Sequence, residues 1–432
     1  MVLCARAFGA AETPNPGLKY YYPAPEAPVV DVEADIIVYG GTSGGVTAAV
    51  QAVRQGNTVA LVVFGRHVGG LTSGGLTETD GVNASVQGGI TREFFNLTGN
   101  KGFKPSVAEA AFESLLADPV PGETWDAPIP TYFEQRLDSV EKDGARILAL
   151  HMENGSVFRG RMFIDCTYEG DLMARAGVSY TYGREAQSVY GESLAGRKAS
   201  VALPGVDPYL VEGDPSSGLI FNLMPDEVEG PVGSGDDHIQ AYNFRMYTVE
   251  NSNPANRQPL FQPAGYDASM FTILYRYHKS GGSTSMQVGN DINNHELFNR
   301  GVATDHIGGN RWSYDGGATW IPWANADYAT RELMFQSHVS WQLGMLWYLQ
   351  NDPDYAALAT DPSVPQTTRN NIAALVARMQ NLGLPLGEYP ETGGWSHELY
   401  IRSSRRLVSD FLVTQAQYAG VTHVVASLAL AN

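Results

Sequence analysis

A strand, a glycine-rich turn, a helix and a second strand follow one another near the start of the chain, and this unit constrains the fold most. An apolar strand is expected over residues 35–39, and it runs directly into Gly40-Gly41-Thr42-Ser43-Gly44-Gly45. Residues 46–55 place apolar side chains on one helical face, and Gly56 is typical of the position just after a helix. Residues 58–63 are expected to form the second strand. This order predicts a βαβ phosphate-binding unit and therefore an α/β fold.

Three sequence motifs are partly matched by this glycine turn. A P-loop is excluded because Val46 stands where that motif needs its phosphate-binding lysine. Gly41, Ser43 and Gly45 match the nucleophile elbow of α/β-hydrolases, but only one strand is expected before them, whereas that fold places several there. A dinucleotide-binding turn matches with Gly40 and Gly45 as its first and third glycines and Thr42 in place of the second. An ordinary α/β turn stays open as the alternative.

The dinucleotide-binding interpretation makes its own expectations for nearby residues. The backbone N–H groups at the start of the helix would receive a pyrophosphate. The end of the second strand usually carries an acid that binds the ribose, and here Phe64 stands at that position. Arg66 and His67 follow and are candidates for other contacts with the adenosine half.

Charge and composition exclude several classes of protein. The chain has 28 Lys plus Arg and 46 Asp plus Glu, which gives a net charge of −18. Such an acidic surface repels phosphate backbones and argues against nucleic-acid binding. No apolar segment reaches the roughly 18 residues that a membrane span needs. The two cysteines, Cys4 and Cys166, do not indicate a disulfide framework, and the absence of an HExxH pattern leaves no metal site predicted.

Further sequence blocks resemble one known family. They are Arg66-His67-Val68-Gly69-Gly70-Leu71-Thr72-Ser73 and residues 88–95, 163–186, 242–247, 291–294, 326–332 and 391–408. Together with the glycine turn, these blocks resemble the bacterial FAD-dependent oxidoreductases of the glutathione-reductase-like superfamily, some of which carry a xanthan-lyase label. The resemblance extends from about residue 34 to about residue 420.

The resemblance implies a Rossmann-like FAD-binding domain interrupted by an inserted α+β substrate domain. Residues 1–33 would then be a lead-in, 34–186 the first FAD-binding segments, 187–325 the substrate domain, and 326–432 a helical segment that returns toward the FAD site. The cofactor is expected to be FAD. Its expected binding residues are Gly40, Thr42, Ser43, Gly44, Gly45, Arg66, Gly69, Gly70, Ser73, Asp165, Thr167 and Asp171, with a helix N-cap as the alternative role for Asp171.

Periodicity predicts several further elements. Residues 145–149 and 157–164 are expected to be strands on either side of the turn Glu153-Asn154-Gly155. Residues 327–351 are expected to form a long amphipathic helix whose tryptophans, Trp341 and Trp347, belong to the core. A polar loop is expected over 352–368 and another helix over 369–382.

The candidate catalytic residues are His397 and Arg402. Removing a hydride from a C–H bond also requires an acceptor for a proton, and a histidine commonly supplies it. His397 follows Gly393-Gly394, which is expected to begin a helix that carries Arg402, Arg405 and Arg406. Arg402 would bind an anionic group of the substrate or the charge of the reduced flavin.

The expected reaction is hydride transfer from a small polar substrate to FAD, with carbohydrates as a candidate class. The sequence contains a second polar cluster, with members Asp291, Asn293, Asn294, Asp305 and His306. Such a cluster suits a polyhydroxylated substrate, and a structural turn network is the alternative. The alternatives are a glycan lyase or hydrolase that uses FAD transiently, and an inactive flavin-fold protein. The latter follows from an apparent loss of family similarity after about residue 418, which would weaken FAD binding by omitting a C-terminal block.

The cellular location stays open. Gly9-Ala10-Ala11 is typical of a signal-peptide cleavage site, but no basic start and no long apolar run precede it. The expected location is the bacterial cytoplasm, or the periplasm or exterior if a longer signal peptide preceded residue 12. The oligomeric state is not predicted.

Overall fold

A computed structural model describes residues 17–21, 28–76, 87–99, 102–119, 127–198, 205–220, 230–237, 239, 242–284 and 323–418. The chain forms two compact units, and each is built from segments that are separated in sequence. Tyr22–Tyr182 and Ser403–Asn432 form one, which we call the sheet unit. Met1–Tyr21 and Gly183–Arg402 form the other, which we call the helical unit.

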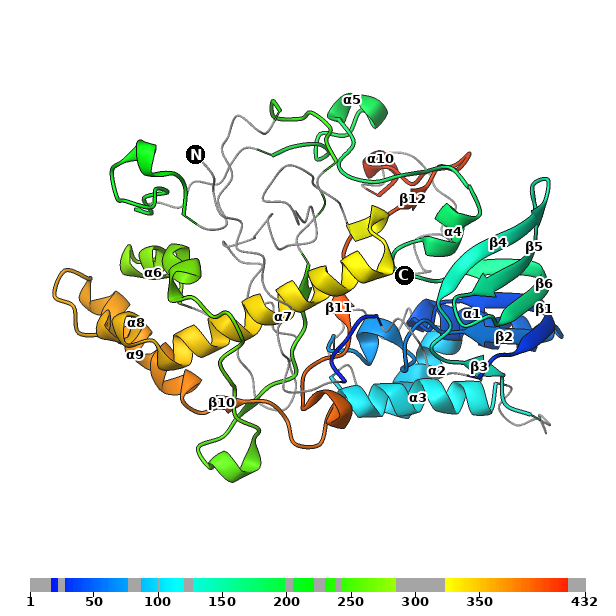
Figure 1. Cartoon of the computed structure of the whole chain (residues 1–432), viewed down its shortest axis with the longest axis horizontal. Coiled ribbons are helices and arrows are strands. Elements are labelled where there is room, and N and C mark those ends of the chain that lie inside the picture. Colours follow the sequence, from blue (N-terminus) through cyan, green and yellow to red (C-terminus); the bar gives the residue numbers. More distant parts are fainter. Residues whose placement is uncertain are drawn as a thin grey trace. The chain divides into compact units, whose positions relative to one another are not determined.

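The sheet unit is organised around a six-stranded sheet (Figure 1). Four strands run parallel in the order β3 (Thr131–Tyr132), β2 (Val59–Val62), β1 (Asp31–Tyr39) and β6 (Val157–Asp165). Two antiparallel strands, β5 (Arg146–Met152) and β4 (Leu137–Asp143), complete the sheet beside β6. This arrangement confirms the predicted Rossmann-like α/β fold, and the strands expected at 145–149 and 157–164 are present.

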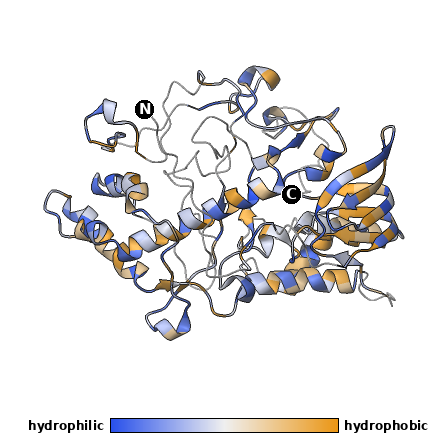
Figure 2. Ribbon diagram, in the orientation of Figure 1, coloured by the Kyte–Doolittle hydropathy of each residue, from blue (hydrophilic) through white to orange (hydrophobic). Residues whose placement is uncertain are grey.

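Helix α1 (Ser43–Arg54) packs on the sheet as its apolar periodicity predicts. It buries Val46, Ala49, Val50 and Val53 in a core shared with α3 (Pro105–Ala117) and α2 (Gly89–Thr98). The strands of the sheet are rich in apolar residues (Figure 2). A second apolar cluster, which contains Phe158, uses side chains of the strands that alternate with those of the first.

The first strand is longer than the sequence predicted. Residues 31–34 were expected to belong mostly to an irregular lead-in, but Asp31–Ala34 pair in register with Val157–Gly160 of β6. The extension is therefore stabilised by a neighbouring strand that comes more than a hundred residues later, and local sequence carries no signal for that pairing.

Short elements complete the sheet unit. They are the 3-10 turn η1 (Gly70–Thr72), helix α4 (Asp171–Arg175), strands β7 (Tyr180–Thr181) and β12 (Arg406–Leu407), and helix α10 (Gln415–Tyr418). Strand β12 pairs antiparallel with β7. The helix predicted after His397 is thus wrong, because Arg406 and Leu407 are extended and paired with β7.

The helical unit contains helices joined by small two-stranded ladders. Its helices are α5 (Gln187–Tyr190), α6 (Thr272–Lys279), α7 (Tyr328–Asn351), α8 (Pro353–Ala357) and α9 (Gln366–Met379). Strand β8 (Asn243–Phe244) pairs antiparallel with β11 (Leu399–Tyr400), and β9 (Val249–Glu250) pairs with β10 (Leu382–Gly383). The polar loop expected at 352–368 is partly wrong, because α8 lies inside it.

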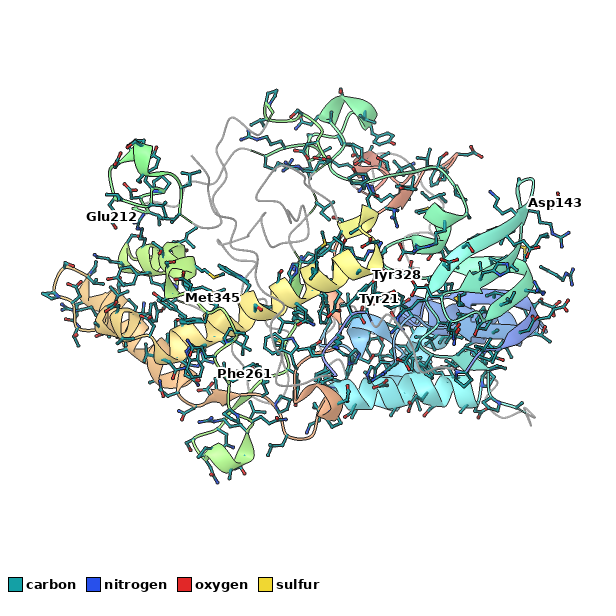
Figure 3. The ribbon with its side chains drawn as sticks, viewed as in Figure 1. Tyr21, Asp143, Glu212, Phe261, Tyr328 and Met345 are labelled. Atoms are coloured by element: carbon teal, nitrogen blue, oxygen red, sulfur yellow. The ribbon has the colours of Figure 1, made fainter. Side chains whose placement is uncertain are left out.

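Helix α7 has the predicted extent but not the predicted amphipathic character. Asp327 caps its start by accepting a hydrogen bond from the Thr330 backbone at 2.7 Å. Every residue from Met334 to Leu346 is buried, so side chains are covered on all sides of the helix. Near its start, the rings of Tyr21 and Tyr328 lie 5.6 Å apart (Figure 3). A helix enclosed on all faces needs no polar stripe.

Among the described residues, the helices are too short or too polar to cross a bilayer.

Candidate functional site

The turn between β1 and α1 is built by glycines that allow close backbone contacts. A Cβ placed on Gly45 would lie 1.9 Å from the carbonyl oxygen of Gly40, so the helix packs directly against the end of the strand. Gly40 has a φ of +118°, and a Cβ there would lie 2.6 Å from the backbone of Cys166. Both positions therefore require glycine for packing inside the sheet unit.

Thr42, which departs from the glycine motif, acts as the N-cap of α1. Its hydroxyl donates to the Cys166 carbonyl at 2.8 Å and accepts from the Gly45 N–H at 3.2 Å. The side chain is thus directed into the protein, and it leaves the outer side of the turn to the backbone. A Cβ on Gly44 would meet only the Thr42 hydroxyl, at 3.5 Å, so the space beside Gly44 is open.

These features suit a pyrophosphate. The first turn of a helix presents N–H groups that lack intrahelical partners, and the helix dipole adds positive potential there. Open space at Gly44 allows an anion to approach, and glycine at position 45 holds the helix close to the strand. The residues present therefore fit the phosphate end of a dinucleotide such as FAD.

The segment after β2 lies against this turn. The Gly69 N–H donates to the Gly41 carbonyl at 2.7 Å, and a Cβ on Gly69 would collide with the Phe112 ring at 2.4 Å. The Leu71 N–H donates to the Tyr168 hydroxyl at 2.8 Å, and that hydroxyl also fills the space beside Gly70. This loop is therefore fixed against the glycine turn.

The polar side chains of the same segment bond within the protein. Arg66 bonds the Glu134 carboxylate at 3.0 Å, and His67 lies 2.9 Å from the Glu109 carboxylate. Ser73 is buried and donates to the Val68 carbonyl at 2.5 Å. The side chains of Arg66 and Ser73 thus make their contacts inside the sheet unit, and their role in cofactor binding stays a prediction.

Asp165 and Thr167 organise the turn after β6. One Asp165 oxygen accepts from the Thr167 backbone N–H at 3.0 Å and from its hydroxyl at 2.7 Å, and the other accepts from the Met173 N–H at 2.8 Å. Burial raises the pKa of the Asp165 carboxyl above its ordinary value. Because β1 and β6 are parallel neighbours, Asp165 and Thr167 stand at the same sheet edge as the glycine turn.

Asp171 is not the N-cap of α4. That position belongs to Gly170, which has a φ of +69° and makes no side-chain cap, and Asp171 is the first helical residue. Its buried carboxylate binds the Arg405 guanidinium at 2.8 Å and lies 3.6 Å from that of Arg175. Asp171 therefore ties the late segment that carries β12 to the sheet unit.

Cys166 is a free thiol at the same edge of the sheet. Burial, and to a smaller degree the nearby Asp165 carboxylate, raise its pKa to about 11. The thiol is therefore protonated at neutral pH and has little nucleophilic character.

His397 lies in a tight turn of the helical unit. Tyr389 has a φ of +51°, and Gly393 and Gly394 have φ values of +65° and +84°. A Cβ on Gly394 would lie 2.7 Å from the Pro385 carbonyl oxygen. Left-handed backbone at a residue other than glycine costs free energy, and such strain gathers at functional sites.

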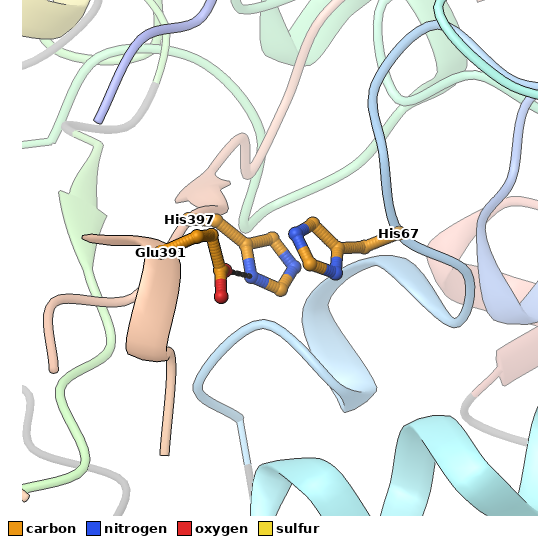
Figure 4. A group of neighbouring side chains, drawn as sticks. All are labelled: His67, Glu391 and His397. Carbon is orange, nitrogen blue, oxygen red and sulfur yellow. Dashed lines mark ion pairs between the residues drawn. The ribbon is translucent and has the colours of Figure 1, made fainter. Parts of the chain in front are cut away.

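The same turn brings a carboxylate to the histidine. Nδ1 of His397 lies 4.0 Å from Oε1 of Glu391 (Figure 4). The Tyr389 ring packs edge-on to the imidazole, with centroids 5.3 Å apart. The His397 side chain is only 11% exposed. At this distance the two groups are not hydrogen-bonded, and they form an ion pair when the imidazole carries a proton.

Arg402 also belongs to the helical unit. Its guanidinium carbon lies 4.5 Å from the centroid of the Tyr400 ring, and that of Arg245 lies 4.7 Å from the same centroid. Arg405, three residues later, belongs to the sheet unit instead. The sequence therefore predicted one helix where the chain passes from one unit to the other.

Sequence reasoning missed several of these residues. Glu391, Tyr168 and Glu134 were not singled out, since each acts on a residue far away in sequence or across a turn. The local signal that could have indicated Glu391 was its position six residues before His397. The predicted polar cluster at residues 291–306 lies outside the described residues.

Comparison with known proteins shows which family the chain resembles. A family model described as FAD dependent oxidoreductase matches residues 35–432, so similarity continues past residue 418, where we expected it to fade. No curated protein sequence matches significantly.

Several solved enzyme structures are similar over part of the chain. A closed cyclohexanone monooxygenase is 14% identical, with 32% of this chain and 26% of that chain covered and a TM-score of 0.25. An L-proline dehydrogenase from P. horikoshii is 12% identical, with coverages of 36% and 59% and a TM-score of 0.27. An L-amino acid deaminase from Proteus vulgaris is 12% identical, with coverages of 38% and 54% and a TM-score of 0.26.

The chain thus covers less than two thirds of each of these three structures. The family assignment rests on the model that matches residues 35–432, and the parallel sheet with its glycine turn agrees with it. The cofactor that follows from this match is FAD. The chain belongs to the FAD-dependent oxidoreductase family.

Proposed function

We propose that this protein is an FAD-dependent oxidoreductase that removes a hydride from a small polar substrate. The observation that carries the proposal is the glycine turn at the start of α1, whose open side at Gly44 suits a pyrophosphate, within a chain matched by the family model. FAD, when bound, would supply the hydride acceptor. Carbohydrates, suggested by the composition of residues 291–306, are the candidate class of substrate.

The chain's own residues would handle the proton. When a C–H bond next to a hydroxyl or amine loses its hydride, the O–H or N–H proton must leave as the C=O or C=N bond forms. We propose that His397 accepts this proton and that Glu391, 4.0 Å away, orients the ring and stabilises its charged form. The turn defined by Tyr389 and Gly394 holds both side chains in place.

The cofactor placement is tested with Gly44→Val. The added side chain enters the open space at the start of α1, so FAD affinity should fall about tenfold or more, as loss of one or two charge-assisted hydrogen bonds would cause. Gln51→Val, on an exposed position of the same helix, is the control and should bind as the parent does. Equal FAD affinity of Gly44→Val and the parent, measured by fluorescence titration, would show that the phosphates lie elsewhere.

The role of His397 is tested by reducing the bound flavin anaerobically with a panel of sugars, alcohols and hydroxy acids. A substrate is recognised by loss of the visible flavin absorbance. His397→Gln should slow that loss about a hundredfold or more, as expected for a general base. Glu391→Gln should slow it less and shift its pH profile, and His151→Gln, in the sheet unit, should leave it unchanged. An unaltered rate in His397→Gln would remove the histidine from the mechanism.

A further inference from the structure

Strands β8 and β11 form a small ladder with two chemically different faces. Tyr400 lies opposite Asn243 and Leu399 opposite Phe244, and residues opposed in a ladder share one face. Phe244 and Leu399 are buried, and the Phe244 ring packs edge-on to Phe335 of α7 with centroids 5.0 Å apart. The apolar face is therefore turned to the core, and the other face carries Asn243 and Tyr400.

Two arginines extend this second face. Arg245 follows Asn243 by two residues and Arg402 follows Tyr400 by two, so each lies just beyond the end of its strand. Their contacts place both beside Tyr400, because the two guanidinium carbons lie 4.7 Å and 4.5 Å from the Tyr400 ring centroid. Arg245 is buried, while Tyr400 and Arg402 are half-buried, so the face is reached from the side of the latter two. We call these four residues the arginine–tyrosine face.

Asn243 gives an independent indication that this face takes a ligand. The side chain is only 2% exposed, yet neither its Nδ2 nor its Oδ1 has a hydrogen-bond partner within the described part of the chain. A buried amide without partners is destabilising, and native proteins rarely keep one without a role. A ligand that both accepts and donates hydrogen bonds would satisfy it.

We propose that the arginine–tyrosine face binds a carboxylate group of the substrate. Planar guanidinium groups match the two oxygens of a carboxylate, and the Asn243 Nδ2 would donate to the same group. The Asn243 Oδ1 would accept a hydrogen bond from a hydroxyl or amine next to the carboxylate. A hydroxyl or amine is also the group that the proposed oxidation requires. That the ligand is the molecule that is oxidised rests on the proposed function. This site narrows the class of substrate from small polar molecules to acids.

Calorimetric titration of the FAD-loaded protein tests the site without relying on turnover. Benzoate should bind. Benzamide has the same shape without the charge, and its affinity should be lower than that of benzoate by a factor of about ten or more. Arg402→Gln should weaken benzoate binding about tenfold, with Arg402→Lys retaining part of the affinity. Arg369→Gln, which changes an arginine of α9 that bonds the Asp361 carbonyl, should bind benzoate as the parent does.

Asn243→Leu separates a binding role from a structural one. Replacing an unpartnered amide by an apolar side chain of similar size should leave thermal stability equal or higher, while benzoate affinity falls. Retained affinity in Asn243→Leu, equal binding of benzamide, or no benzoate binding to the parent would each overturn the proposal. Tighter binding of inorganic phosphate than of benzoate would overturn the carboxylate assignment. Because affinity is measured without catalysis, failure of flavin reduction and failure of this site are distinguishable.

Discussion

Gly44 and Gly45 are adjacent but have different surroundings. Gly45 packs against the end of β1, whereas the space beside Gly44 is open to a ligand. A methyl group at Gly45 would meet the Gly40 carbonyl oxygen at 1.9 Å, whereas at Gly44 it would meet only the Thr42 hydroxyl at 3.5 Å. Gly45→Ala should therefore lower the free energy of unfolding by about 1–3 kcal/mol, because helix and strand must move apart. The measurement is equilibrium unfolding in guanidinium chloride.

Gly44→Ala is the matched control for that measurement. Alanine lowers the entropy of the unfolded chain and favours helix, so this variant should be as stable as the parent or up to about 1 kcal/mol more stable. Equal stability of Gly45→Ala and Gly44→Ala would contradict the close contact between α1 and β1.

The Asp171–Arg405 pair is the second feature that belongs to the residue scale. Both side chains are buried, at 4% and 8% exposure, and the charged atoms are 2.8 Å apart. Removing one partner leaves an uncompensated charge, so Asp171→Ala should lower the free energy of unfolding by about 3–5 kcal/mol. Arg405→Met in the same chain should restore part of that loss, which thermal or denaturant unfolding of the double variant would reveal. Additive losses would mean that the two charges are not coupled.

At the scale of the element, α7 shows how burial couples a helix to pH. His338 is buried in the middle of this helix, and its Nδ1 lies 2.7 Å from the Met334 carbonyl. Burial lowers the pKa of His338 to about 4. The same cause lowers that of His278 in α6 to about 4, and its Nδ1 lies 2.7 Å from the Tyr355 hydroxyl. These histidines are neutral in the folded protein at pH values where the unfolded chain already binds a proton.

The stability of the helical unit should therefore fall as pH drops from about 6.5 to 4. In that window the unfolded state carries more protons, and each buried histidine removes up to about 3 kcal/mol from the free energy of unfolding. His338→Met should flatten this dependence by about half, as read from denaturant unfolding at several pH values. His151→Gln, at a partly exposed position of β5, should leave the slope unchanged. A slope in His338→Met equal to that of the parent would contradict the assignment.

At the scale of the whole molecule, each unit is completed by a segment from far along the chain. Residues 403–418 return to the sheet unit, where β12 pairs with β7 and Ser404 donates to the Glu169 carbonyl at 3.2 Å. A chain ending after Arg402 should therefore lose hydrogen-exchange protection at Thr181, which lies opposite Arg406, and melt at a lower temperature. A chain ending after Tyr418 keeps β12, so it should retain the hydrogen-exchange protection and the melting temperature of the parent. Protection that persists in the shorter chain would show that β7 does not depend on β12.

The βαβ unit, its glycine turn and the family could be predicted from the amino-acid sequence, because these are local signals. A strand, a glycine turn and an apolar helical face lie within one short segment, so their pattern can be recognised from neighbouring residues. Helix α7 and its cap at Asp327 were also predictable, since 3.6-residue periodicity and an N-cap side chain act within a few residues.

The other features could not be predicted in this way, because they depend on contacts between segments that are distant in sequence. The first four residues of β1 are ordered by β6, the polar face of α7 is absent because other chain segments cover it, and the expected helix after His397 is replaced by strands that pair with β8 and β7. The grouping of Asn243, Arg245, Tyr400 and Arg402 likewise arises from a ladder between residues more than 150 positions apart. Pairing of this kind is decided by packing and shared hydrogen bonds rather than by local propensity.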